Sequence, residues 1–84
     1  MNVGMLWFDN DPKANLESKI ARAAGYYEKK YGLAPDLCFV HPSMLHKGAM
    51  RTKAGKIEVR GNRSVLPNHL WIGIHVPSTA GAIS

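Results

Sequence analysis

Val3-Gly4-Met5-Leu6-Trp7-Phe8 is an unbroken apolar run, and two similar runs follow it in this 84-residue chain, Leu37-Cys38-Phe39-Val40 and Leu70-Trp71-Ile72-Gly73-Ile74. A strand with one face in water alternates apolar and polar residues, whereas a continuous apolar strand is typical of a sheet that is buried on both faces. The three runs therefore predict a sheet with two faces to cover.

A single amphipathic helix is predicted between the first two runs. Apolar residues recur there at intervals of three and four, as one face of a helix requires: Leu16, Ile20, Ala23, Ala24, Tyr27 and Tyr31. Asn15 is a suitable N-cap, and Glu17 lies in the first turn, where the helix dipole favours an anion. Gly32 fits the left-handed position after the last turn, and Pro35 prevents the helix from continuing.

The order of elements predicts an α+β domain: strand, helix, strand, strand and strand, in a mixed four-stranded sheet with the helix on one face. The strands are expected at Val3–Phe8, Leu37–Val40, Lys56–Arg60 and His69–His75. Residues 1–76 are expected to form this single domain, because so short a chain has room for only one core. Residues 77–84 are expected to form a flexible C-terminal tail. Since one helix covers one face, the other face is predicted to bind a partner.

The last apolar run distributes its side chains unevenly over the two faces. In an extended strand Trp71, Gly73 and His75 point to one side, and the aliphatic residues between them point to the other. Such a mixture suits a subunit contact, because tryptophan supplies buried area and glycine permits close approach. We expect a homodimer formed through the uncovered face, with Trp7, Trp71, Gly73 and His75 at the interface.

Positive charge supplies an alternative function. The formal net charge of +5 favours anionic partners. A helical projection places five residues on one flank of the predicted helix: Lys19, Arg22, Tyr26, Lys29 and Lys30. The polar loop that follows the second apolar run adds Lys47, Arg51, Lys53 and Lys56. In a nucleic-acid-binding protein these cations would contact phosphates and Tyr26 would stack on a base. A solvated face that keeps the protein in solution is the structural alternative.

Asp9 and Asp11 follow the first apolar run, at the end of a strand where open α/β sheets bind ligands. The Asp-x-Asp pattern resembles phosphotransfer enzymes of the haloacid dehalogenase type, in which the first carboxylate attacks phosphorus and the pair holds magnesium. The chain departs from that pattern, because Lys13 replaces a hydroxyl residue and the chain is too short for that core. A metal-dependent hydrolase using Asp9 and Asp11 is a further alternative, and turn formation by Asp9-Asn10-Asp11-Pro12 is the structural one.

Two further patterns and the single cysteine have simpler explanations. Pro35-Asp36 and Glu58-Val59-Arg60 resemble the signature of metal-dependent nucleases, but arginine stands where those enzymes have lysine. The four histidines lack the spacing of zinc ligands, and His41 is expected to cap backbone groups at a strand end. Cys38 is expected to be a buried, reduced thiol.

Three segments resemble short bacterial proteins with no assigned activity: Leu6–Lys13, Phe39–Ser43 and Leu66–Gly73. The resemblance implies a free-standing bacterial domain and transfers no site residue. A single cysteine and the lack of an export signal predict a cytoplasmic protein. The sequence predicts no cofactor and no membrane partner, and it favours a non-enzymatic interaction module over an enzyme.

Overall fold

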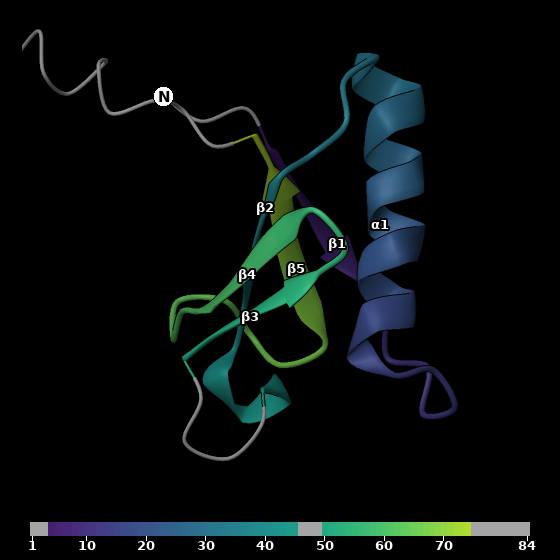
Figure 1. Ribbon diagram of the computed structural model, residues 1–84. Coiled ribbons are helices and arrows are strands. Elements are labelled where there is room, and N and C mark those ends of the chain that lie inside the picture. The colour runs from purple at the N-terminus through teal and green to yellow at the C-terminus, as the bar shows by residue number, and fades with distance from the viewer. Residues whose placement is uncertain (1–3, 46–49, 75–84) are drawn as a thin grey trace, which may run out of the picture.

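The computed structural model describes residues 4–45 and 50–74, which form one α-helix packed on one face of a five-stranded sheet (Figure 1). The elements are, in chain order, β1 (Gly4–Phe8), α1 (Leu16–Tyr31), β2 (Leu37–Val40), the 3₁₀ turn η1 (Pro42–Met44), β3 (Arg51–Ala54), β4 (Ile57–Gly61) and β5 (His69–Gly73). The predicted α+β class is confirmed, whereas the predicted tail at 77–84 lies outside the described residues. Within the described ranges no helix has the length and apolar character needed to cross a bilayer.

The sheet has the strand order β1-β5-β2-β4-β3. β5 is antiparallel to both of its neighbours, β1 and β2, so these two strands run parallel to each other on either side of it. β2 and β4 pair in parallel, and β3 and β4 form an antiparallel hairpin. The mixed sheet is confirmed, and β5 lies between the first two strands of the chain.

The expectation of four strands is wrong, because β3 forms inside the segment that was expected to be a loop. β3 is joined to β4 by a tight turn in which Gly55 has a φ of 62°. Arg51, Thr52 and Lys53 are all exposed. An edge strand with water on both sides needs no apolar residues, and lysine on such an edge discourages pairing with other chains. β3 therefore carries no apolar pattern by which the sequence could reveal it.

The capping residues predicted from the sequence are found at both ends of α1 and at the start of η1, which follows β2. Asn15 Oδ1 accepts a hydrogen bond of 2.8 Å from the backbone N–H of Ser18, which satisfies a donor of the first turn. Gly32 has a φ of 75°, the left-handed conformation expected after the last turn. His41 Nδ1 accepts a hydrogen bond of 3.1 Å from the backbone N–H of Ser43, so this histidine caps η1.

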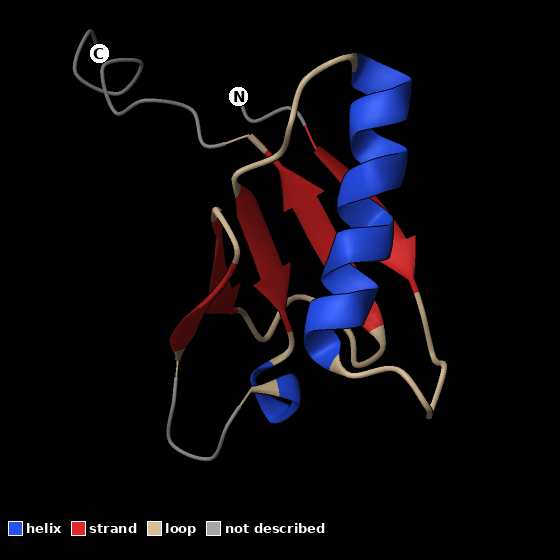
Figure 2. Ribbon diagram, turned by 45° about the vertical axis from the view of Figure 1, so that its right-hand side comes forward, coloured by secondary structure: helices blue, strands red, loops and turns tan. Residues whose placement is uncertain are grey.

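The hydrophobic core lies between α1 and one face of the sheet (Figure 2). Its buried residues are Ile20, Ala23 and Tyr27 from α1, and Cys38, Val40, Ile57, Val59, Leu70 and Ile72 from the strands. Burial raises the pKa of the Cys38 thiol to about 12. The thiolate is therefore scarce at neutral pH, and Cys38 acts as a small apolar core residue rather than as a nucleophile.

No α-helix of the described residues covers the opposite side of the sheet, which we call the open face (Figure 2). Residues that are partners across neighbouring strands point to the same side, so the pairing defines this surface. It consists of Gly4, Leu6, Phe8, Leu37, Phe39, Arg51, Lys53, Glu58, Arg60, His69, Trp71 and Gly73. The open face is apolar and aromatic over β1, β5 and β2, and charged over β4 and β3. An uncovered face was predicted, but its charged half was not.

Candidate functional site

One row of side chains crosses the open face from edge to edge. Its members are direct partners on successive strands: Leu6 on β1, Trp71 on β5, Phe39 on β2, Arg60 on β4 and Arg51 on β3. Side chains at directly opposed positions lie about 4.5–5.5 Å apart at their Cβ atoms. The row therefore changes from aliphatic through aromatic to cationic without an intervening gap.

Trp71 and Phe39 form the aromatic part of this row. Their ring centroids are 5.5 Å apart and their planes are inclined by 48°, and both residues are partly exposed. A Cβ atom at Gly4 would lie 2.2 Å from Cζ2 of Trp71. The indole therefore rests against the backbone of β1, an approach that requires glycine. One side of the indole is supported in this way, and Trp71 as a whole is partly exposed.

The cationic part of the row lies on β4 and β3. Arg60 Nε donates a hydrogen bond to the Glu58 carboxylate, which fixes the guanidinium next to Phe39. The guanidinium carries four more N–H donors on its two terminal nitrogens. Arg51 and Lys53 are both exposed. Three cations and one carboxylate occupy this half of the open face, so it attracts anions.

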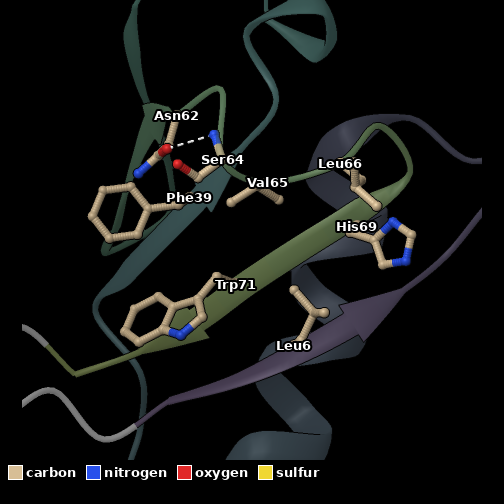
Figure 3. A pocket seen from close by; sticks show the side chains of 8 residues that line it. All are labelled: Leu6, Phe39, Asn62, Ser64, Val65, Leu66, His69 and Trp71. Atoms are coloured by element: carbon tan, nitrogen blue, oxygen red, sulfur yellow. Dashed lines mark hydrogen bonds between the residues drawn. The ribbon is translucent and has the colours of Figure 1, made fainter.

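A hollow of about 450 Å³ lies where the segment between β4 and β5 folds over the open face (Figure 3). It is lined by Leu6, Phe39, Asn62, Ser64, Val65, Leu66, His69 and Trp71. The Asn62 N–H donates a 2.7 Å hydrogen bond to the Val40 carbonyl, which holds the start of this segment against β2. Asn68 has a φ of 66° and turns the chain into β5. Tryptophan and phenylalanine are thus combined with amide, hydroxyl and imidazole groups around one hollow.

The cations predicted to bind nucleic acid are divided between the two sides of the sheet. One group belongs to α1, on the covered side: Lys19, Arg22, Tyr26, Lys29 and Lys30. Arg51 and Lys53 belong to the open face. Lys56 is exposed in the turn between β3 and β4, and Lys47 lies outside the described residues. The helix flank and the strand cations therefore do not share one surface.

Several members of the α1 group make contacts within the protein. Lys19 is largely buried, with 8% of its surface exposed. The ring of Tyr26 packs on Trp7, with centroids 5.3 Å apart, and the Lys30 ammonium lies 5.4 Å from the centroid of the Tyr31 ring. Lys19 is therefore unavailable to a ligand, whereas Tyr26 remains 50% exposed and Lys29 and Lys30 are exposed on the helix flank.

The predicted interface residues are also divided. Trp71 and Gly73 lie on the open face, whereas Trp7 pairs with Leu70 in register and points to the covered side. His75 lies outside the described residues, and β5 ends at Gly73. The assignment of Trp7 to the uncovered face is wrong, because an unbroken apolar run carries no alternation from which the two sides can be distinguished.

Asp9 and Asp11 form an ion-pair cluster with Arg22. The Arg22 Nη1 atom lies 3.3 Å from Oδ2 of Asp9 and 3.3 Å from Oδ2 of Asp11. Asp9 Oδ1 also accepts a 3.1 Å hydrogen bond from the Asp11 N–H, as the turn explanation requires. In the part of the chain that the structure describes, no three His, Cys, Asp or Glu side chains are grouped as metal ligands. The Arg22 guanidinium therefore supplies the positive charge that the Asp9 and Asp11 carboxylates attract.

This cluster predicts a pH-dependent contribution to stability. The backbone N–H of Asp11, helped by Arg22 and Lys19 against the effect of burial, lowers the pKa of Asp9 below its ordinary value of 3.8. A lowered carboxyl pKa stabilises the folded state above the ordinary value, and this contribution is lost as the pH falls through the lowered pKa. We expect Asp9→Asn to lower the free energy of unfolding at neutral pH, and the difference from wild type to close in acid. Urea unfolding of both proteins across this range measures it, and a difference independent of pH would contradict the assignment.

The nuclease-like pattern does not assemble a pair of carboxylates on one side of the sheet. The Glu58 N–H donates a 2.9 Å hydrogen bond to the Asp36 carbonyl, so the two residues are neighbours. The Glu58 carboxylate is paired with Arg60 on the open face. Asp36 immediately precedes Leu37, which lies on the open face, and successive side chains of an extended chain alternate, so Asp36 belongs to the covered side.

Phe39, Arg60, Asn62, Ser64 and His69 lie on the open face or line its hollow, and none of them is among the binding or interface residues predicted from the sequence. The clean alternation of Lys56–Arg60 does mark Arg60 as a residue on a wet face. The sequence contains no signal that places Phe39 beside Arg60 or Trp71, because that placement depends on the order of the strands.

No protein-family model matches the chain, and no curated protein or solved structure is significantly similar to it. Known proteins therefore supply neither an activity nor a ligand, and the side chains of the open face are the basis on which function is inferred.

Proposed function

We propose that this protein binds single-stranded nucleic acid on the open face. Bases stack on Trp71 and Phe39, and phosphates are bound by Arg60, Arg51 and Lys53. The observation that carries the proposal is the row across the sheet, in which two partly exposed aromatic residues, Trp71 and Phe39, are followed on the next two strands by Arg60 and Arg51. Aromatic rings next to a cationic groove are the combination by which single strands are bound, because every base has a face to stack and every nucleotide has a charge.

A single strand fits these groups better than a duplex does. In a duplex the base faces are stacked on one another and are unavailable to protein rings, whereas an unpaired strand exposes them. Trp71 is supported by the β1 backbone at Gly4 and presents its ring from the surface of the sheet rather than from the tip of a loop. A ring so placed can receive a splayed base, but it cannot enter a groove of a double helix.

Self-association through the same face is a second candidate function. Three large apolar side chains support it, since Leu6, Phe8 and Leu66 are 63%, 57% and 64% exposed. An apolar patch beside charged residues is typical of protein interfaces. Two copies of a chain with net charge +5 repel each other, however, and the charged half of the open face would have to be accommodated in the dimer.

The test of the proposed function is a binding titration at several salt concentrations, with a labelled mixed-sequence oligonucleotide of about ten nucleotides. Three phosphate contacts on a single strand predict a slope of log K against log salt of about −2. The chain has two tryptophans, so a Trp7→Phe variant isolates Trp71. We expect its fluorescence to be quenched on binding, since the base stacks on that ring. Absence of binding at low salt would end the proposal.

Two charge variants locate the site. Arg51→Gln removes one cation from the open face, and Lys29→Gln removes one exposed cation from α1, so both have the same net charge. We expect Arg51→Gln to weaken binding and to reduce the salt slope by about 0.7, while Lys29→Gln binds like wild type. If Lys29→Gln weakens binding and Arg51→Gln does not, the binding site lies on the flank of α1.

Light scattering distinguishes the second candidate. A dimer formed through the open face should dissociate when the oligonucleotide binds, because both would use Trp71 and Phe39. Phe8→Ser removes an exposed aromatic side chain that does not line the hollow. It should reduce the mass of such a dimer while leaving both rings of the Trp71–Phe39 pair in place. A monomeric mass at tens of micromolar would exclude self-association as the function.

A further inference from the structure

The two outer edges of the sheet differ in the residues that would meet a further strand. At the edge formed by β3, Arg51, Thr52 and Lys53 are exposed, and lysine on an edge discourages pairing with other chains. β1 forms the other edge, and among the described strands it pairs only with β5 (Figure 2). Gly4–Phe8 contains no charged residue, no proline and no bulge. Such an edge is a template on which another strand can pair.

The outer side of β1 carries main-chain hydrogen-bonding groups. The Asp9 N–H donates a 2.9 Å hydrogen bond to the Asn68 carbonyl, which continues the register of β1 with β5. Bonded positions alternate along an antiparallel strand, so every second residue of β1, counted back from Asp9, bonds to β5. The N–H and carbonyl groups of the other three residues are directed away from the sheet: Gly4, Leu6 and Phe8.

The sequence of β1 is complementary to its own antiparallel copy. The register that pairs all five residues and joins the outward main-chain groups places Leu6 opposite Leu6 of the second copy. Gly4 is then opposite the second copy's Phe8, and Met5 is opposite the second copy's Trp7. Each ring therefore faces glycine or the flexible methionine side chain, and no charges of the same sign are opposed.

We propose that β1 pairs edge to edge with β1 of a second copy of this chain, so that two five-stranded sheets become one continuous sheet. The twofold axis passes at Leu6, and about six main-chain hydrogen bonds close the junction. Paired residues point to the same side of a sheet, so the two open faces lie on one side of the dimer. The row of each copy, which begins at Leu6, continues into the row of the other. This pairing leaves Trp71 and Phe39 uncovered and does not depend on the proposed function.

Neither the helices nor the net charge opposes this arrangement. α1 packs mainly against β5, so the two helices are three strand spacings apart, about 14 Å, whereas helices in contact are about 8–10 Å apart. The cations of the open face lie on β4 and β3, and the two β4 strands are seven spacings apart, roughly 34 Å. At physiological ionic strength the Debye length is about 8 Å, so repulsion over this distance is screened.

Two cysteine variants test the register. Leu6→Cys places two thiols opposite each other on the axis, with Cα atoms about 5.5 Å apart, which a disulfide can bridge. Phe8→Cys is the matched control, because Leu6 and Phe8 are similarly exposed, at 63% and 57%, but its two Cα atoms would be about 14 Å apart. The native Cys38 is buried. We expect Leu6→Cys alone to give a covalent dimer on a non-reducing gel after mild oxidation. Equal cross-linking of both variants, or of neither, would overturn the inference.

Two proline variants test the edge by light scattering. The wild type should have a dimeric mass at tens of micromolar. Phe8→Pro should lower this mass, because it removes an outward N–H of β1 and keeps the bonds to β5. Lys53→Pro is the control on the opposite edge. The Gly61 N–H bonds to the Met50 carbonyl in register with β3, so the Lys53 N–H also points outward, and this variant should keep the dimeric mass.

Addition of the oligonucleotide separates the edge dimer from the other proposals. An edge dimer should bind it without dissociating, whereas a dimer formed through the open face should dissociate. A monomeric wild type, or dissociation by the oligonucleotide, would overturn the edge pairing while nucleic-acid binding stands. A cross-linked Leu6→Cys dimer with a wild type that binds no oligonucleotide would confirm the edge pairing and exclude the proposed function.

Discussion

Replacing Phe39 and Trp71 together by alanine is expected to weaken the binding of single-stranded oligonucleotides by at least about 30-fold. Stacking on one aromatic side chain contributes about 1–3 kcal/mol per base, so the loss of two rings costs about 2 kcal/mol or more. The rings touch, with centroids 5.5 Å apart, so the two losses will not be strictly additive. Anisotropy titrations of wild type, both single variants and the double variant measure the effect.

The matched control for this experiment is Tyr26→Ala. Tyr26 is also an exposed aromatic residue, but it lies on α1 and packs on Trp7. We expect its affinity to equal that of the wild type, and circular dichroism should show that all variants retain the fold. A double variant that folds and binds normally would exclude the aromatic row as the binding site.

The largest effect on stability is expected from Ile72→Ala, at about 2–5 kcal/mol. Ile72 is fully buried between the sheet and α1, so truncation removes apolar contacts and leaves a cavity in a small core. Small domains have only about 5–15 kcal/mol of stability in total. The midpoint and slope of urea unfolding measure the change.

Leu6→Ala is the control on the other side of the same sheet. Leu6 belongs to the neighbouring strand and is 63% exposed, and exposed substitutions of this kind usually change stability by about 0.5 kcal/mol or less. Similar effects for Ile72→Ala and Leu6→Ala would contradict the distinction between a covered and an open face.

The parts of the fold that could be predicted from the sequence depend on neighbours along the chain. The amphipathic stripe, the Asn15 cap and the Gly32 terminus act over a few residues, and all three are found as expected. The two sides of β5 were also assigned correctly, since Leu70 and Ile72 are buried and Trp71 lies on the other side. β3 was missed because an exposed edge strand has no need of an apolar pattern.

The site that we propose on the open face differs from the one predicted from the sequence, for a different reason. The sequence-based prediction placed the binding cations on one flank of the helix, because the spacing of residues along the sequence decides which side chains are neighbours on a helix. The row on the open face instead joins residues from five strands, and Trp71 meets Phe39 because β5 lies between β1 and β2. The sequence carries the alternation within each strand, but the order of the strands depends on packing between distant segments.

The central position of β5 also constrains when the protein can fold during synthesis. The segment His69–Gly73 pairs with both β1 and β2. Until this segment has been synthesised, β1 and β2 lack the strand that lies between them and pairs with both. Such pairings close long loops and form slowly. The ribosome must therefore release residues through Gly73 before the sheet is continuous, and until then the exposed strands of the nascent chain are open to aggregation or to a chaperone.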